Sequence, residues 1–237
     1  MEIRISKTKE DLAEAFSIFF KSLVEVSETA NVAVSGGNSP RAIFDFLAEH
    51  FGDEIDWRKV NLYWVDERCV HPGNEESNYK MTNDHLLSKI EIPKDNIFRM
   101  RGEDNPEKEA RRYSELLSKN LPQENEVPQF DLVVLGLGDD GHTASIFPES
   151  MELWDSEENC VVGTHPTSGQ KRVTITGKVI NHAKAVVFMV TGDGKADKVR
   201  EITRHQGDYK DYPASHVNPD TPDFIWFLDE SAASELD

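Results

Sequence analysis

The sequence of 237 residues predicts a single α/β domain, in which a mostly parallel sheet carries helices on both of its faces. Short apolar, β-branched runs alternate with amphipathic stretches along the chain, which is typical of this class. The run Leu132–Leu135 is continuously apolar, as expected of a strand covered on both faces. The composition shows no sharp change that would mark a second domain. We therefore expect one domain that spans residues 1–237.

The amino-terminal half predicts a repeated order of strand then helix. Ile3 and Ile5 alternate with polar residues in a first strand, and Thr8 with Asp11 resembles a capping box that opens a helix ending near Val26. The pattern then predicts a strand at 31–35, a helix at 40–51, a strand at 60–65, a helix at 79–90 and a charged helix at 106–118.

The carboxyl-terminal half continues the alternation with more strands. The polar, proline-bearing stretch 120–129 is expected to be a surface loop. The remaining pattern predicts strands at 131–135, 160–164, 172–176 and 185–191, a helix at 195–205 and a last strand at 224–228.

Acidic residues dominate the charge of the chain. Lys and Arg total 26 against 44 Asp and Glu, giving a formal net charge of -18, which argues against binding to nucleic acid or to an anionic membrane. The same charge would repel an anionic substrate, so a phosphate site would have to gather its own cations and backbone N–H groups. The start of the chain lacks an apolar signal core, and we expect a cytoplasmic protein. Cys69 and Cys160 form no CxxC pair, so we expect reduced thiols and no zinc site.

The segment 136–141 matches the glycine pattern G-x-G-x-x-G directly after a strand, which raises the possibility of a dinucleotide-binding turn. We reject this reading. Asp139 and Asp140 would bring negative charge to a pyrophosphate, and Pro148 limits any long helix after the turn.

A catalytic histidine explains the same turn better. His142 could act as a general base, and Asp140 could hold one nitrogen of its ring so that the other faces a water molecule. The alternative is a histidine that is satisfied within the turn, beside aspartates that cap a helix. The Asp-Gly-His order at a strand's carboxyl end favours the catalytic interpretation.

A second motif lies at the end of the strand predicted at 31–35. Its glycines allow a ligand to approach the backbone, and the following helix would point its free N–H groups at an anion. Taken alone, the motif could equally be an ordinary helix cap. The residues of this predicted phosphate loop are Ser35, Gly36, Gly37, Asn38 and Ser39.

Four charged residues complete the predicted site. Asp66 and Arg68 follow the strand at 60–65, where Arg68 could hold a phosphate and Asp66 could bind sugar hydroxyls or fix a cation. Arg172 opens a strand and Lys195 opens a helix, where a lysine opposes the helix dipole unless it serves an anion. Each could instead be a surface charge or part of a surface ion pair.

Taken together and in this order, the motifs resemble those of the 6-phosphogluconolactonases. They are Ser35–Pro40, Trp64–Arg68, Asn78, Leu135–Pro148, Arg172–Thr176, Gly194–Ala196 and Trp226–Asp229. The resemblance implies a Rossmann-like layered fold and hydrolysis of 6-phospho-D-glucono-1,5-lactone in the oxidative pentose phosphate pathway. It also implies a small sugar-phosphate lactone as partner, and neither metal nor organic cofactor. A monomer is the default expectation.

Carried over by position, His142 matches the family's catalytic histidine and Asp140 its partner. Arg68, Arg172 and Lys195 match the cations expected around the phosphate. Three alternatives remain: a sugar-phosphate sensor of the same fold, a glucosamine-6-phosphate deaminase-like isomerase and, more distantly, a dehydrogenase. The deaminase turn resembles Asp-Gly-His-Ile-Ala-Phe-Asn-Glu-Pro, and this chain lacks its glutamate.

Overall fold

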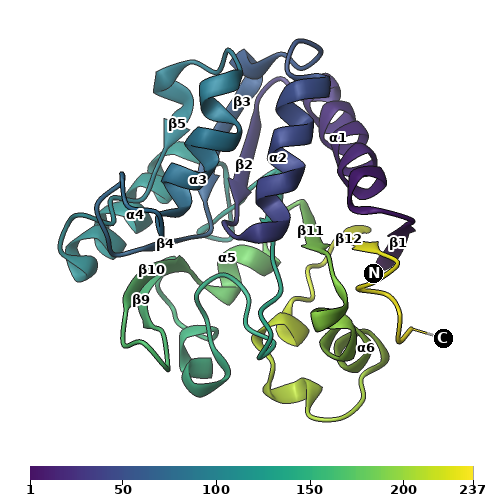
Figure 1. Ribbon diagram of the computed structural model, residues 1–237. Helices are drawn as coiled ribbons and strands as arrows, with labels where there is room; N and C mark the ends of the chain where they lie inside the picture. The colour runs from purple at the N-terminus through teal and green to yellow at the C-terminus, as the bar shows by residue number, and fades with distance from the viewer. Residues whose placement is uncertain (237) are drawn as a thin grey trace.

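A seven-stranded parallel sheet forms the centre of the molecule (Figure 1). The computed structural model describes residues 1–236. The strand order is β1-β12-β11-β8-β2-β3-β5, and every neighbouring pair is parallel, which confirms the predicted sheet. The strands are β1 (Glu2–Ser6), β2 (Ala30–Val34), β3 (Val60–Trp64), β5 (Ile97–Phe98), β8 (Leu132–Leu135), β11 (Ala185–Val190) and β12 (Asp223–Asp229).

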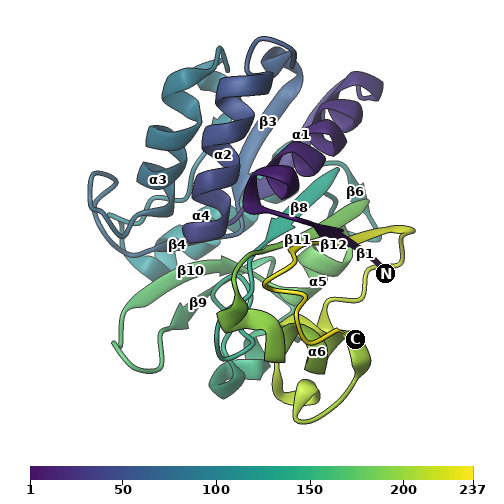
Figure 2. The same cartoon turned by 45° about the vertical axis from the view of Figure 1, so that its right-hand side comes forward.

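Helices cover both faces of this sheet, as predicted (Figures 1 and 2). Successive residues of a strand point to opposite faces, so Val32 and Val34 of β2 pack in the core on one side and Ala33 in the core on the other. One core includes side chains of α1 (Lys9–Val26), α2 (Asn38–Phe51) and α3 (Asn78–His85). The other includes those of α4 (Pro106–Asn120), α5 (Gly177–Asn181) and α6 (Ala196–Arg204).

A second, smaller sheet was not predicted. It pairs β4 (Asp66–Arg68) with β10 (Lys171–Ile175), and β10 with β9 (Cys160–Thr164), all antiparallel. The sequence indicated strands at 160–164 and 172–176 but gave no sign of this sheet. Asp66 and Arg68 do follow the strand β3, as predicted, but they also begin and end β4, which the sequence did not indicate.

Two further expectations were wrong. The helix expected at 79–90 ends at His85 and is followed by a short 3-10 helix, Leu87–Lys89. Leu86 has a φ of -133° and a ψ of -67°, outside the α-helical range, so the helix does not continue through it. The loop expected at 120–129 contains a hairpin of β6 (Gln123–Glu124) and β7 (Val127–Pro128).

The order of the strands determines where a ligand can bind. From β2 the chain proceeds outward to β3 and β5, and then returns to β8 on the other side of β2. This reversal leaves a crevice beyond the carboxyl ends of β2 and β8, where parallel sheets of this kind bind ligands. Separately, no helix within residues 1–236 is long and apolar enough to cross a bilayer.

Candidate active site

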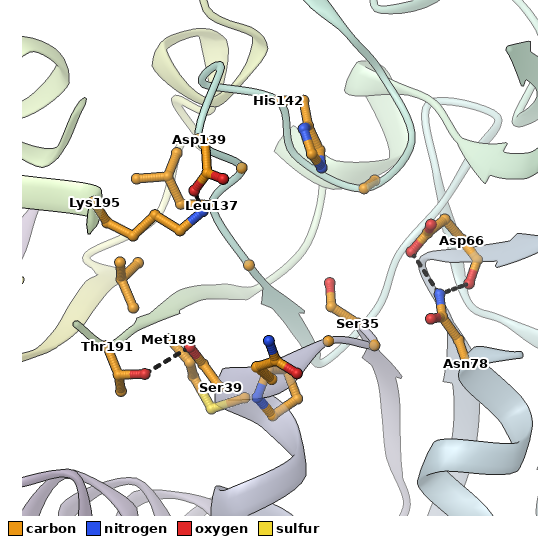
Figure 3. A pocket seen from close by; sticks show the side chains of 18 of the residues that line it. Ser35, Ser39, Asp66, Asn78, Leu137, Asp139, His142, Met189, Thr191 and Lys195 are labelled. Carbon is orange, nitrogen blue, oxygen red and sulfur yellow. Dashed lines mark hydrogen bonds and ion pairs between the residues drawn. The ribbon is translucent and has the colours of Figure 1, made fainter. Parts of the chain in front are cut away.

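A cavity of about 600 Å³ lies at the carboxyl ends of β2, β8 and β11 (Figure 3). The structure brings to it every residue of the predicted site except Asp140, which contacts His142 from outside the lining. In Figure 3, His142 and Ser35 lie on opposite sides of the cavity, with Lys195 and Asp139 to one side and Asp66 and Asn78 to the other.

The imidazole of His142 is fixed by Asp140. One oxygen of that carboxylate, Oδ1, accepts a hydrogen bond from the backbone N–H of His142 at 3.0 Å. The same oxygen lies 2.6 Å from Nδ1 of the ring. Burial raises the pKa of Asp140, but hydrogen bonding to His142 and electrostatic attraction to it outweigh that effect and lower the pKa to about 2. Because this ionised carboxylate accepts a hydrogen bond from Nδ1, it favours the tautomer with its proton on Nδ1 and leaves Nε2 as the acceptor. The ring also lies so close to Gly138 that a Cβ there would come 2.1 Å from Nδ1.

The predicted phosphate loop joins β2 to α2. Gly37 occupies the N-cap position of α2 with a φ of 115°, and no side chain caps the helix. Its first backbone N–H groups are therefore available to an anion. A Cβ on Gly36 would come 1.9 Å from the amide oxygen of Asn78, so any other residue at this position would have to displace the Asn78 side chain. The hydroxyls of Ser39 and Thr191 lie 2.8 Å apart and tie the loop to the end of β11.

Arg68 and Arg172 are direct cross-strand partners of β4 and β10. Like charges placed opposite each other destabilise a sheet. Arg172 is only 8% exposed, the Nε atoms of both are buried without a partner, and neither guanidinium lies within 4.0 Å of a carboxylate of any described residue. Burial and the charge of Arg68 lower the pKa of Arg172. The pair therefore has the properties of an anion site.

Asp66 does not neutralise these arginines through direct contact. The residue is 4% exposed, and its carboxylate accepts a hydrogen bond from the Ser145 hydroxyl at 2.6 Å and one from the Asn78 amide at 3.2 Å. Both donors are neutral. The carboxylate lines the cavity, and its predicted contact with substrate hydroxyls stays a prediction.

Lys195 lies at the N-cap position of α6, as the sequence indicated. Its ammonium group pairs with the carboxylate of Asp139, a side chain that is 86% exposed. This pair joins the turn after β8 to the turn after β11 across the edge of the cavity (Figure 3). Because an exposed ion pair is weak, an anion in the cavity could compete with Asp139 for Lys195.

Several lining or supporting residues were not predicted. Ser145 and Asn78 hold Asp66, and Lys9 lines the cavity from the start of α1. The ring of Phe147 lies 4.7 Å from that of His142 and 5.5 Å from the guanidinium carbon of Arg172. Ser145 and Phe147 belong to the same motif as His142, so their proximity in sequence was the available signal.

The turn after β8 does not have the form of a dinucleotide site. Gly138 donates its N–H to the carbonyl of His142 at 2.8 Å, which folds the turn back on itself. The next helical residues are the 3-10 segment Pro148–Leu153, so no helix begins at the glycines. Within residues 1–236, no group of three or more His, Cys, Asp or Glu side chains is arranged to hold a metal ion.

Comparison with known proteins shows similarity along most of the chain. A profile of the glucosamine-6-phosphate isomerases/6-phosphogluconolactonase family matches residues 5–226. The 6-phosphogluconolactonase of Treponema pallidum is 46% identical over 183 residues, covering 77% of this chain and 76% of that protein. That of Haemophilus influenzae is 37% identical over 226 residues, covering 95% and 94%. The solved 6-phosphogluconolactonase of Trypanosoma brucei has a TM-score of 0.85 at 27% identity, covering 100% of this chain and 98% of the other.

Proposed function

This chain belongs to the glucosamine-6-phosphate isomerase/6-phosphogluconolactonase family, and from that membership we infer that it hydrolyses 6-phospho-D-glucono-1,5-lactone to 6-phospho-D-gluconate. The resemblance indicated by the motifs is thereby confirmed. Relatives named 6-phosphogluconolactonase support lactone hydrolysis over the isomerase reaction in the family's name. The proposal includes a step of the oxidative pentose phosphate pathway in the cytoplasm, and it invokes no metal or organic cofactor.

One observation supports this function more than any other. The arginine pair of β4 and β10, for which no residue within 1–236 supplies a counter-ion, lines the same cavity as His142. A site for a phosphate thus lies beside a candidate base for activating water. A sugar-phosphate lactone offers both required groups, an anion to anchor and a carbonyl to attack.

In the proposed mechanism the phosphate anchors the substrate. Its oxygens accept hydrogen bonds from the loop 35–39 and from Arg68, Arg172 and Lys195, the last of which leaves Asp139. Binding energy from this remote group then positions the lactone carbonyl near His142, which lowers the entropic cost of the reaction.

His142 performs the proton transfers in this proposal. Its Nε2 takes a proton from water as the water oxygen bonds to C1, and a tetrahedral oxyanion forms. The C1–O bond of the ring then breaks, and the imidazolium returns the proton to the departing ring oxygen. Asp140 keeps the ring oriented and stabilises the imidazolium throughout. The product carries a carboxylic acid at C1, which releases its proton to solvent and becomes a carboxylate at neutral pH, and a hydroxyl at C5.

The test is hydrolysis of freshly generated 6-phosphogluconolactone, with spontaneous opening subtracted in a matched blank. The wild-type chain should accelerate hydrolysis with saturation. His142→Ala should lower kcat by about 100-fold to 10,000-fold, the usual contribution of a positioned general base. His50→Ala, at an exposed histidine of α2, is the matched control and should retain full activity.

Two results would contradict parts of the proposal. If His142→Ala kept the wild-type rate, the function would stand and the assigned base would be wrong. If neither protein accelerated hydrolysis, the lactonase function would be rejected, and isomerisation of glucosamine 6-phosphate would be assayed next.

A further inference from the structure

We propose that Ser145 is a positioning residue, whose hydroxyl keeps Arg172 separate from Asp66 and so leaves the guanidinium available to the substrate's phosphate. The inference rests on the proposed function, since it assigns Ser145 a part in binding that phosphate. Ser145 is not a catalytic residue in this proposal. It acts through the arginine.

The hydroxyl of Ser145 lies between the two charges. The residue is fully buried, and its Oγ is 2.6 Å from Oδ2 of Asp66 and 3.5 Å from Nη1 of Arg172. A hydroxyl has one proton and two lone pairs, so it donates to the carboxylate and presents a lone pair to the guanidinium. The backbone N–H of Ser145 donates to the hydroxyl of Thr174 at 3.2 Å, which anchors Ser145 to β10, the strand that carries Arg172.

Without that hydroxyl, the two charges would have a reason to meet. Asp66 and Arg172 are 4% and 8% exposed, and a carboxylate and a guanidinium in a buried setting favour direct, bidentate pairing. The Asn78 amide occupies the other oxygen, Oδ1, at 3.2 Å. The two neutral donors thus satisfy Asp66 and leave the arginine with an unpartnered Nε. Figure 3 shows the Asn78 side of this arrangement.

Removal of the hydroxyl should therefore weaken anion binding, because Arg172 and Asp66 would form a direct ion pair. In Ser145→Ala, Arg172 can pair with the freed oxygen of Asp66, and its guanidinium is then no longer available to a phosphate. We expect the Kd for inorganic phosphate to rise about tenfold or more, the value of one hydrogen bond to a charged group. The KM for the phosphorylated lactone should rise with it, and kcat should change much less.

A second variant, Asp66→Asn, distinguishes this ion pair from a loss of packing around Ser145. Asp66→Asn removes the charge that would hold Arg172, so Ser145→Ala combined with Asp66→Asn should bind phosphate within about threefold of Asp66→Asn alone. Ser17→Ala is the matched control, because Ser17 is also fully buried and its hydroxyl donates only to the carbonyl of Ala13 at 2.7 Å. Its phosphate Kd should equal that of the wild type.

The measurements are titration calorimetry of the full chain with inorganic phosphate, thermal unfolding of each variant and lactone kinetics. An unchanged Kd in Ser145→Ala would overturn the proposal. So would a double variant whose Kd exceeds that of Asp66→Asn alone by the same factor as the Kd of Ser145→Ala exceeds that of the wild type. If the four Kd values follow the prediction but the wild type does not hydrolyse the lactone, the role of Ser145 is supported and the proposed function is rejected. Absence of phosphate binding by the wild type would overturn both the anion site and the role of Ser145.

Discussion

A single carboxylate oxygen, Oδ1 of Asp140, contacts both the backbone N–H and the ring of His142. The pKa of this carboxyl is lowered from 3.8 to about 2. A lowered pKa means that the ionised group stabilises the fold above its ordinary pKa, and that this contribution is lost as the pH falls through the folded value. The window therefore lies between about pH 4 and pH 2.

We expect the wild type to have a larger free energy of unfolding than Asp140→Asn at about pH 6, and the difference to shrink towards zero near pH 2. Urea unfolding over the pH range in which both proteins remain folded measures this difference. Asp155→Asn, at an exposed aspartate, should show no such trend. A difference that stays constant with pH would mean that the asparagine acts through packing alone.

Single residues also show where sequence reasoning reaches its limit. The histidine at position 142 and the glycines around it are informative, because few residue types can act as a general base or form a tight turn. Ser145 looks like an ordinary polar residue of a turn, and its role depends on Asp66, which lies 79 positions away. Asn78 could be noticed in a motif, but its contact with Gly36 depends on the packing of α3 against the phosphate loop.

At the scale of elements, a buried carboxylate joins β4 to α3. Glu67 is 2% exposed and accepts hydrogen bonds from the backbone N–H groups of Arg68, Asn78 and Tyr79 and from the hydroxyl of Ser77, at 2.7 to 3.0 Å. Burial raises the pKa of Glu67, and the four donors offset part of that cost. The start of α3 thus holds its free N–H groups against a negative charge.

We expect Glu67→Ala to lower the free energy of unfolding by about 2–4 kcal/mol, since it leaves several buried donors unsatisfied. Glu67→Gln, which keeps the volume and one acceptor oxygen, should cost less. Denaturant unfolding measures both, with Glu75→Ala as the control because that side chain is 89% exposed. A loss equal to that of Glu75→Ala would show that water replaces the carboxylate without cost.

The same elements explain which parts of the fold the sequence could predict. The strands of the main sheet are short, apolar and β-branched, so their pattern is visible locally. β4 consists of Asp, Glu and Arg, types with little preference for strands, and it becomes a strand only through its pairing with β10. The hairpin of β6 and β7 was missed for a similar reason, because its four residues include only one β-branched side chain.

For the whole molecule, the distribution of charge separates the cavity from the rest of the chain. The total is -18, yet the lining contains Lys9, Arg68, Arg172 and Lys195 against Asp66 and Asp139. From the sequence, this concentration of cations could be inferred only because an anionic substrate would require it. The fold meets it by placing strand ends and helix starts from distant parts of the chain at one edge of the sheet.

The surplus of carboxylates should also govern how salt affects stability. Repulsion among like charges destabilises the compact state, and the Debye length falls from about 30 Å at 0.01 M to about 8 Å at 0.15 M salt. We therefore expect the Tm at neutral pH to rise by a few degrees as NaCl increases over this range. Near pH 4.8, the isoelectric point, the same salt should leave the Tm unchanged or lower it, because it then screens mainly attractive ion pairs.

Chloride bound at the arginines would raise the Tm at both pH values, so scanning calorimetry at the two values separates specific binding from screening. A Tm that falls with salt at neutral pH would mean that pairs such as Arg99–Glu103 outweigh the net repulsion.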